Sequence, residues 1–254
     1  MDKALEGKEV AIIGLGGSYA DYVIARINSK KFDEVWGINS IGAIIHVDRT
    51  FMMDPAGRFL DDVKAGTQTG VAREFLLETP NKGPIYSCCL DKRVPEIIEY
   101  PLAEVIRELG YAYFNNTVAY SIAYAIANKV KKIHLFGIDF SYKQNVNFAE
   151  AGRACCEFWC AIALSKGIIV ETAKRSGFLD TNVPAHEKLY GYHRLEDPLV
   201  QYIEGGNLVV VRKSEYEGHE EPEESAPEPL DGKNPVVLGL HDIEGVTYVA
   251  EKEL

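Results

Sequence analysis

The chain has 254 residues, of which 46% are hydrophobic, and its formal net charge is -11 at pH 7. A chain of this length and composition can bury one sizeable core, and its length alone does not require two domains. The acidic excess repels phosphate backbones and anionic membranes, so it argues against a nucleic-acid coat protein but not against an enzyme that meets DNA briefly.

The N-terminus and the cysteines favour a cytosolic protein, in the host cytoplasm if the chain is viral. Residues 1–6 lack the cationic start and apolar run of a signal peptide, and no apolar stretch approaches membrane-spanning length. The five cysteines have no zinc-type spacing and are predicted to be buried free thiols, with a helix-face pair at Cys156 and Cys160 as the alternative. The cysteines are Cys88, Cys89, Cys155, Cys156 and Cys160.

Short apolar runs alternate with stretches of helical periodicity along most of the chain. The predicted strands cover 9–13, 34–39, 49–53, 84–88, 132–139 and 167–171. One predicted helix begins at Ser18, and three others cover 101–109, 117–129 and 148–166. This alternation is typical of an α/β fold with a doubly wound, mostly parallel sheet. Three of the strands stop at glycine or polar residues, where an open parallel sheet places its ligands.

One region within the domain interrupts this pattern. Residues 56–79 are polar with weak periodicity, and we expect a mobile loop with one short helix that acts as a lid.

The chain as a whole is expected to have three segments: a nucleotide-binding domain over 1–200, an extension with an acidic Pro/Glu-rich linker over 201–234, and a short β segment over 235–254. The last segment could form a hairpin that docks on the core or on a partner chain.

A glycine turn follows the first strand. Gly14, Gly16 and Gly17 would let the backbone approach a phosphate, Ser18 would add a hydroxyl donor, and the next helix would present its positive end. Glycines after a strand also often serve only to make the turn, and that alternative stays open.

Two departures argue against an ordinary NAD-dependent dehydrogenase. Tyr19 replaces the third glycine of the dinucleotide fingerprint, and Asn39 stands where an acidic residue would hold the ribose. Asn39 could hydrogen-bond a base, ribose or phosphate, or it could simply lie in a turn.

Other polar residues could act from neighbouring strand and helix ends. Asp139 and Asp54 each follow an apolar strand and could bind a divalent metal, with Asp139 also a candidate general base or the cap of its following loop. Asn116 and Thr117 precede a helix, where they could cap it or bind a phosphate or carboxylate. His186 and His193 are the candidate acid or base residues in an irregular aromatic segment.

Four short motifs together resemble a known superfamily: VAIIGLGGS (10–18), VWGIN (35–39), NTVAYS (116–121) and IHLFGID (133–139). It contains hydroxymethylpterin diphosphokinase-like proteins and the single-domain bacterial sialyltransferases, which have a Rossmann-like fold of GT-A variant type. Residues 10–200 also resemble uncharacterised proteins of tailed phages.

The resemblance implies specific roles. The sialyltransferase pattern implies that Gly14, Gly16, Ser18 and Asn39 contact a donor nucleotide, that Asn116 and Thr117 line its site, and that His186 or His193 is the catalytic base. The diphosphokinase pattern implies ATP and Mg²⁺, with Asp139 and Asp54 as ligands.

Three functions are therefore expected, in this order. The first is a glycosyltransferase-like transferase that uses a nucleotide sugar to modify a sugar or a phage DNA base. The second is a Mg²⁺-dependent diphosphokinase, and the third is a non-catalytic protein that binds or sequesters a nucleotide. No membrane partner is expected, and a homo-oligomer is left open.

Overall fold

The computed structural model describes residues 2–62, 64, 66, 68–79, 83–141, 146–184, 188–189, 199–205, 207–212 and 215–216. The chain divides into two compact units, Met1–Tyr190 and Gly191–Leu254. His186 and His193, the predicted acidic linker and the predicted C-terminal hairpin lie outside the described residues. In the described part of the chain, no helix is long and apolar enough to cross a membrane.

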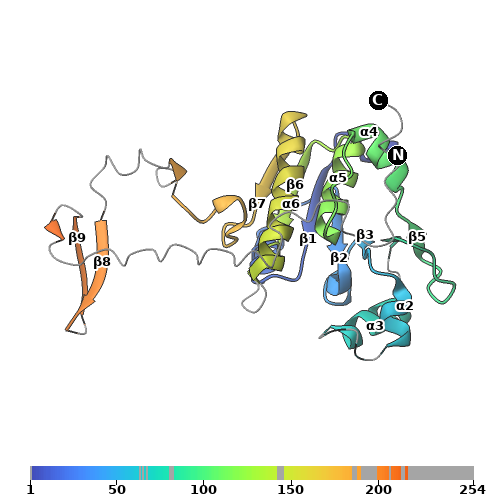
Figure 1. Ribbon diagram of the computed structural model, residues 1–254, viewed down its shortest axis with the longest axis horizontal. Helices are drawn as coiled ribbons and strands as arrows, with labels where there is room; N and C mark the ends of the chain where they lie inside the picture. Colours follow the sequence, from blue (N-terminus) through green and yellow to red (C-terminus); the bar gives the residue numbers. More distant parts are fainter. Residues whose placement is uncertain are drawn as a thin grey trace, which may run out of the picture. The chain divides into compact units, whose positions relative to one another are not determined.

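The first unit is built on a seven-stranded sheet in which every pair of neighbouring strands is parallel. Its strands are β1 (Glu9–Ile13), β2 (Glu34–Ile38), β3 (Arg49–Phe51), β4 (Ile85–Ser87), β5 (Ile97–Glu99), β6 (Lys132–Phe136) and β7 (Ile169–Thr172). The spatial order is β5-β4-β3-β2-β1-β6-β7 (Figure 1). The chain therefore winds outward from β1 to β5 and then returns to the other side of β1, which makes β1 and β6 the switch point of the sheet.

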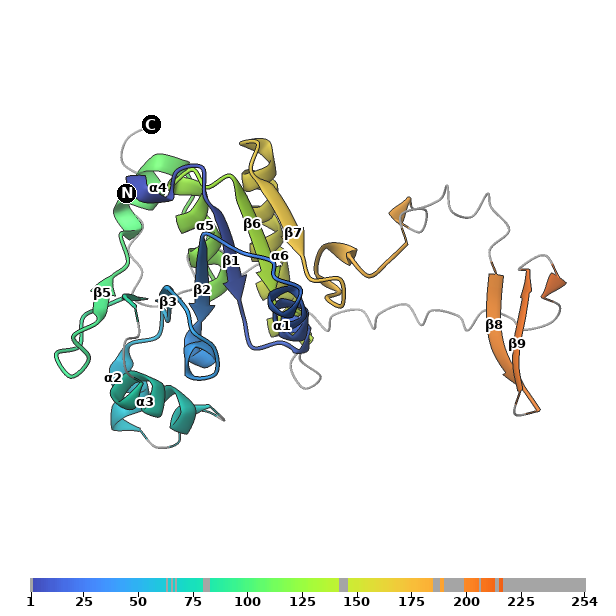
Figure 2. The same cartoon turned by 180° about the vertical axis from the view of Figure 1, so that it is seen from behind.

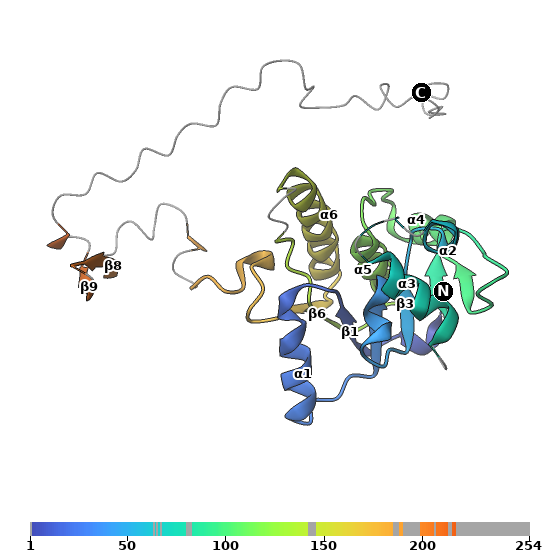
Figure 3. The same ribbon diagram turned by 90° about the horizontal axis from the view of Figure 1, so that it is seen from below.

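Helices cover both faces of this sheet, as a doubly wound fold requires (Figures 2 and 3). The helix α1 (Ala20–Ile27) lies on one face, and α4 (Leu102–Leu109), α5 (Thr117–Ala127) and α6 (Val146–Ser165) lie on the other. Alternate side chains of β1 divide between the two: Val10 and Ile12 join the core under α5 and α6, whereas Ala11 and Ile13 pack on the side of α1. The predicted α/β, doubly wound class is confirmed. Short 3₁₀ helices occur at Lys3–Leu5, Gly17–Tyr19, Asn39–Ala43 and Phe178–Asp180.

The region 56–79 holds more regular structure than the predicted loop with one short helix. This region contains two helices, α2 (Ala56–Asp61) and α3 (Thr69–Glu78), which Figure 1 shows beyond the carboxyl ends of β2 and β3. Each helix is short and buries only a few side chains, so a sequence window shows little periodicity. Phe75 and Leu76 of α3 nevertheless bury themselves in a separate hydrophobic cluster with Met52 and Ile85.

Three further features differ from the prediction. The strand β5 was not expected, and neither was an antiparallel hairpin in the second unit, formed by β8 (Leu199–Glu204) and β9 (Asn207–Arg212). Cys88 and Cys89 are exposed, because they follow the short strand β4 into a surface turn. The other three cysteines are buried free thiols, as predicted.

Candidate functional site

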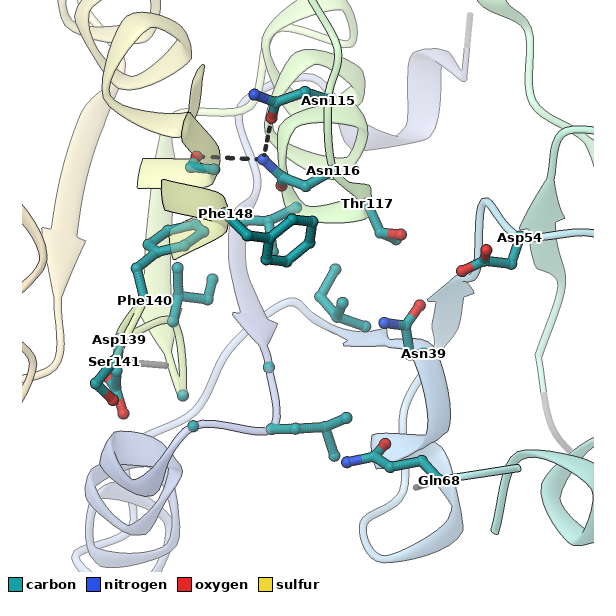
Figure 4. A pocket seen from close by; sticks show the side chains of 18 of the residues that line it. Asn39, Asp54, Gln68, Asn115, Asn116, Thr117, Asp139, Phe140, Ser141 and Phe148 are labelled. Atoms are coloured by element: carbon teal, nitrogen blue, oxygen red, sulfur yellow. Dashed lines mark hydrogen bonds between the residues drawn. The ribbon is translucent and has the colours of Figure 1, made fainter. Parts of the chain in front are cut away.

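A cavity of about 680 Å³ opens at the carboxyl ends of β1, β2 and β6, beside the switch point of the sheet (Figure 4). Its volume lies in the range of small-molecule sites, and its position is the one where open α/β sheets bind ligands. The residues that line it are Gly14, Leu15, Gly16, Ile38, Asn39, Asp54, Arg58, Gln68, Asn115, Asn116, Thr117, Val118, Gly137, Ile138, Asp139, Phe140, Ser141, Phe148 and Gly152.

The glycines of the first turn let two strand ends approach each other. A Cβ atom on Gly14 would overlap the carbonyl oxygen of Gly137, and one on Gly16 would lie 2.6 Å from Oδ2 of Asp139. A Cβ on Gly17 would meet nothing within 4 Å. Gly14 and Gly16 are therefore required by the packing of β1 against β6, although their backbones also form part of the cavity wall.

Ser18 ties the same turn to Asp139. The backbone N–H of Ser18 donates to Oδ2 of Asp139 at 2.8 Å, and its hydroxyl donates to Oδ1. The N–H of Gly137 in turn donates to the Ser18 hydroxyl at 2.9 Å. The Asp139 carboxylate thus occupies the place at this helix start where the sequence predicted a ligand phosphate. Ser18 is buried and is not among the lining residues.

Asn39 differs from the other predicted residues because its side chain has a buried polar atom without a partner. It immediately follows β2 with φ at 54°, in the left-handed region that few non-glycine residues adopt. Its Oδ1 atom is buried and accepts no hydrogen bond. Figure 4 shows the amide directed into the cavity. A buried acceptor without a donor is costly, so this oxygen is suited to a donor that a ligand brings.

Phe140 is a second left-handed residue in the cavity wall, with φ at 48°. Gly152 of α6 makes room for it, since a Cβ there would lie 2.9 Å from the Phe140 ring. Strained backbone of this kind costs free energy and gathers at functional sites. Two of the six such positions among the described residues, Asn39 and Phe140, lie in the wall of this cavity.

The start of α5 also faces the cavity. Asn116 caps this helix, because its Oδ1 accepts a hydrogen bond from the N–H of Ala119 at 3.0 Å. Its Nδ2 donates to Asn115 Oδ1 at 2.7 Å and to the carbonyl of Gly152 at 3.2 Å. The capping interpretation of Asn116 is confirmed. Thr117 has its hydroxyl on the cavity side in Figure 4, beside the positive end of the helix.

The two predicted metal ligands do not come together. Asp54 and Asp139 lie on opposite sides of the cavity in Figure 4, and each has its own partner. Asp139 accepts from Ser18, and Asp54 forms an ion pair with Arg58. Among the described residues, no group of three or more His, Cys, Asp or Glu side chains could hold a metal ion.

Sequence reasoning missed several lining residues, among them Arg58, Gln68, Phe140 and Phe148. Arg58 had a signal, because it lies four residues after Asp54, a spacing at which opposite charges often pair, and here Asp54 lies just before α2. Gln68 had none, since only the folding of α3 beside the 3₁₀ helix Asn39–Ala43 lets it accept a hydrogen bond from Ser40 at 2.9 Å.

No protein-family model matches this chain, and no curated protein sequence matches it. The chain is similar to the solved structure of the sialyltransferase CstII from Campylobacter jejuni in complex with the substrate analogue CMP-3FNeuAc. That similarity has 19% sequence identity, covers 66% of this chain and 82% of that chain, and has a TM-score of 0.41. The apo form of an alpha-2,3-sialyltransferase from the same organism shows 18% identity, coverage of 70% and 81%, and a TM-score of 0.43. At such low identity and TM-score, these similarities by themselves assign neither a ligand nor an activity.

Proposed function

We propose that this chain is a glycosyltransferase-like transferase that binds a nucleotide-activated sugar in the cavity at the ends of β1, β2 and β6. The observation that carries the proposal is Asn39, whose buried Oδ1 has no partner and whose left-handed backbone directs the amide into the cavity. A ribose or sugar hydroxyl, or the N–H of a base, would supply the missing donor.

The chemistry of the wall fits a ligand rich in hydroxyl and amide groups. Asn39, Gln68 and Thr117 offer neutral donors and acceptors, while Asp54, Arg58 and Asp139 are the ionisable side chains among the described lining residues. Neutral polar groups of this kind recognise sugars and bases through directional hydrogen bonds. The positive end of α5 would stabilise the phosphate that joins them.

The transfer step needs a base for the acceptor hydroxyl. We assign this role to His186 or His193: the imidazole takes the hydroxyl proton, the oxygen bonds to the donor carbon, and the nucleotide leaves with the electrons of its bond to that carbon. The acceptor is a sugar or a hydroxymethylated base. A diphosphokinase with Asp54 and Asp139 as joint Mg²⁺ ligands is less favoured, because the two carboxylates lie on opposite sides of the cavity.

The test is Asn39→Gly, because glycine tolerates the left-handed backbone and removes only the side chain. Thermal unfolding would be measured with CMP-sugars, UDP-sugars and Mg²⁺-ATP, since a ligand that binds the folded state raises the melting temperature. We expect one nucleotide sugar to stabilise the wild type and the variant to bind it about tenfold more weakly, as for the loss of one well-placed hydrogen bond.

The melting temperature of the ligand-free variant should not fall, because the lost amide oxygen has no partner to lose. Asn28→Ala is the control, since Asn28 ends α1 and does not line the cavity. Unchanged affinity in Asn39→Gly would overturn the proposed site. Release of free sugar from the nucleotide sugar would indicate a transferase, Mg²⁺-dependent loss of ATP a kinase, and binding without turnover a sequestering protein.

A further inference from the structure

We propose that Asp54 and Arg58 form a ligand-operated latch, in which an anionic oxygen of the ligand takes the Arg58 guanidinium from the Asp54 carboxylate. This inference rests on the proposed function, because it assumes that a nucleotide occupies the cavity. It adds a residue that determines specificity for the charged part of that ligand.

The first observation is the distribution of charge. Arg58 is the one cationic side chain among the described residues that line the cavity, and Asp54 and Asp139 are the two anionic ones. Asp139 already accepts two hydrogen bonds from Ser18. Among the described lining residues, a phosphate or carboxylate that enters the cavity therefore has one cationic side chain to bind, and that side chain pairs with Asp54.

The second observation is that the ion pair is easily exchanged. The side chains of Arg58 and Asp54 are 52% and 36% exposed, and ion pairs with this much solvent contribute little to stability. A guanidinium binds a phosphate or carboxylate through two parallel hydrogen bonds, which are stronger than a solvated surface pair.

The third observation identifies the member that moves. The backbone carbonyl of Asp54 accepts a hydrogen bond from the hydroxyl of Ser87 at 3.2 Å, and Ser87 is the buried last residue of β4. Asp54 is thereby fixed to the sheet. Arg58 extends from α2 on a long side chain with several rotatable bonds, so it can turn from Asp54 toward the cavity without any shift of β4.

The experiment compares each nucleoside with its nucleotide by titration calorimetry, using cytidine and CMP, uridine and UMP, and adenosine and AMP. We expect Arg58→Gln to weaken nucleotide binding about tenfold and to leave nucleoside binding within about twofold, because only the nucleotide carries the anionic oxygen. Asp54→Asn should strengthen nucleotide binding about threefold, because the neutral amide competes less well than the carboxylate for the Arg58 guanidinium. The control is Arg93→Gln, since Arg93 forms comparable surface ion pairs with Asp61 and Asp91 but does not line the cavity.

The double variant separates a latch from simple repulsion. If Asp54 acts by holding Arg58, then Asp54→Asn in the Arg58→Gln background gives no gain in nucleotide affinity. A gain that persists without Arg58 would show that Asp54 only repels the anion, and it would overturn the latch.

The source of the anion is distinguished by a nucleotide sugar that carries a carboxylate. If the Arg58→Gln effect appears with CMP, the anionic oxygen is a phosphate oxygen; if it appears only with CMP-sialic acid, it is the sugar carboxylate. Equal binding of all these ligands by wild type and Arg58→Gln overturns the latch while the proposed function survives. Absence of binding by the wild type overturns both.

Discussion

The glycines of the first turn show how single backbone positions determine the geometry of the site. Gly14 and Gly16 lie against Gly137 and Asp139 so closely that no Cβ fits, whereas Gly17 has open space around it. The sequence presents these glycines as parts of one motif. In the structure, two of them pack β1 against β6 and the third does not.

We expect Gly14→Ala to lower the free energy of unfolding by roughly 1–3 kcal/mol, because the added methyl group overlaps the Gly137 carbonyl and the strand ends must separate. Gly17→Ala should change it by less than about 0.5 kcal/mol. Urea denaturation of both variants checks this. Equal destabilisation by the two substitutions would show that the turn conformation, and not the close approach of the strands, requires glycine.

His134 is a buried titratable residue that the sequence did not single out. Its side chain is 2% exposed and lies beside Phe32 and Phe136. Its ring contacts two carboxylates: Nδ1 is 3.0 Å from Glu171, and Nε2 is 3.4 Å from Glu9.

Burial lowers the pKa of His134 below its usual value of 6.5, with Lys30 and Lys132 acting in the same direction. The two glutamates oppose this shift, but Lys132 also pairs with Glu171 and Lys131 with Glu9, which weakens their attraction for an imidazolium. The neutral imidazole is therefore the form that the folded protein favours.

The unfolded chain then binds more protons than the folded chain as the pH falls below about 6.5. We expect the wild type to have its full His134 contribution above that pH and to lose it progressively as the pH falls. His134→Gln, which cannot titrate, should show a flatter dependence of unfolding free energy between pH 7 and pH 5, measured by urea denaturation. A steeper loss in the variant would mean that the glutamates dominate and raise the pKa.

At the scale of elements, α3 supports the segment that carries Asn39. The 3₁₀ helix Asn39–Ala43 packs against α3, and a Cβ on Gly42 would lie 2.6 Å from the ring of Phe75. Phe75 is fully buried. The pair α2 and α3 thus contributes more than lining residues, because it fixes the strand end from which the unpartnered amide projects.

We expect Phe75→Ala to destabilise the protein by about 3–5 kcal/mol, as for the loss of a buried aromatic ring, and to weaken nucleotide binding as the segment of Asn39 loosens. Leu77→Ala on the same helix is the matched control, because that side chain is 47% exposed. Hydrogen exchange of residues 39–43 together with ligand titration checks the prediction. Unchanged exchange in that segment would separate α3 from the site.

At the scale of the molecule, every described residue of the cavity belongs to the first compact unit. We expect a chain of residues 1–184 to unfold cooperatively, with nucleotide affinity within about twofold of the full chain. It should lack turnover, because His186 and His193 are removed. Circular dichroism and calorimetry check folding and binding. Retained turnover would exclude both histidines as the base, and lost affinity would place part of the binding site beyond residue 184.

The sequence by itself determined the α/β class and most strands and helices, and it offered capping as one of two roles for Asn116. These features depend on local patterns: β-branched runs, helical spacing, and an Asn before a helix. The strand β5 and one of the two short helices α2 and α3 escaped it, because these elements bury too few residues to show a period and owe their stability to contacts distant in sequence.

The tertiary structure alone decided which polar groups are already satisfied. The sequence offered Ser18, at a helix start, and Asn39, Asp54 and Asp139, at strand ends, as candidate ligand contacts. Folding pairs Ser18 with Asp139 and Asp54 with Arg58, and it leaves the buried oxygen of Asn39 without a partner. Hydrogen bonding between side chains from different strands depends on their positions in space, which residue spacing along one strand does not contain.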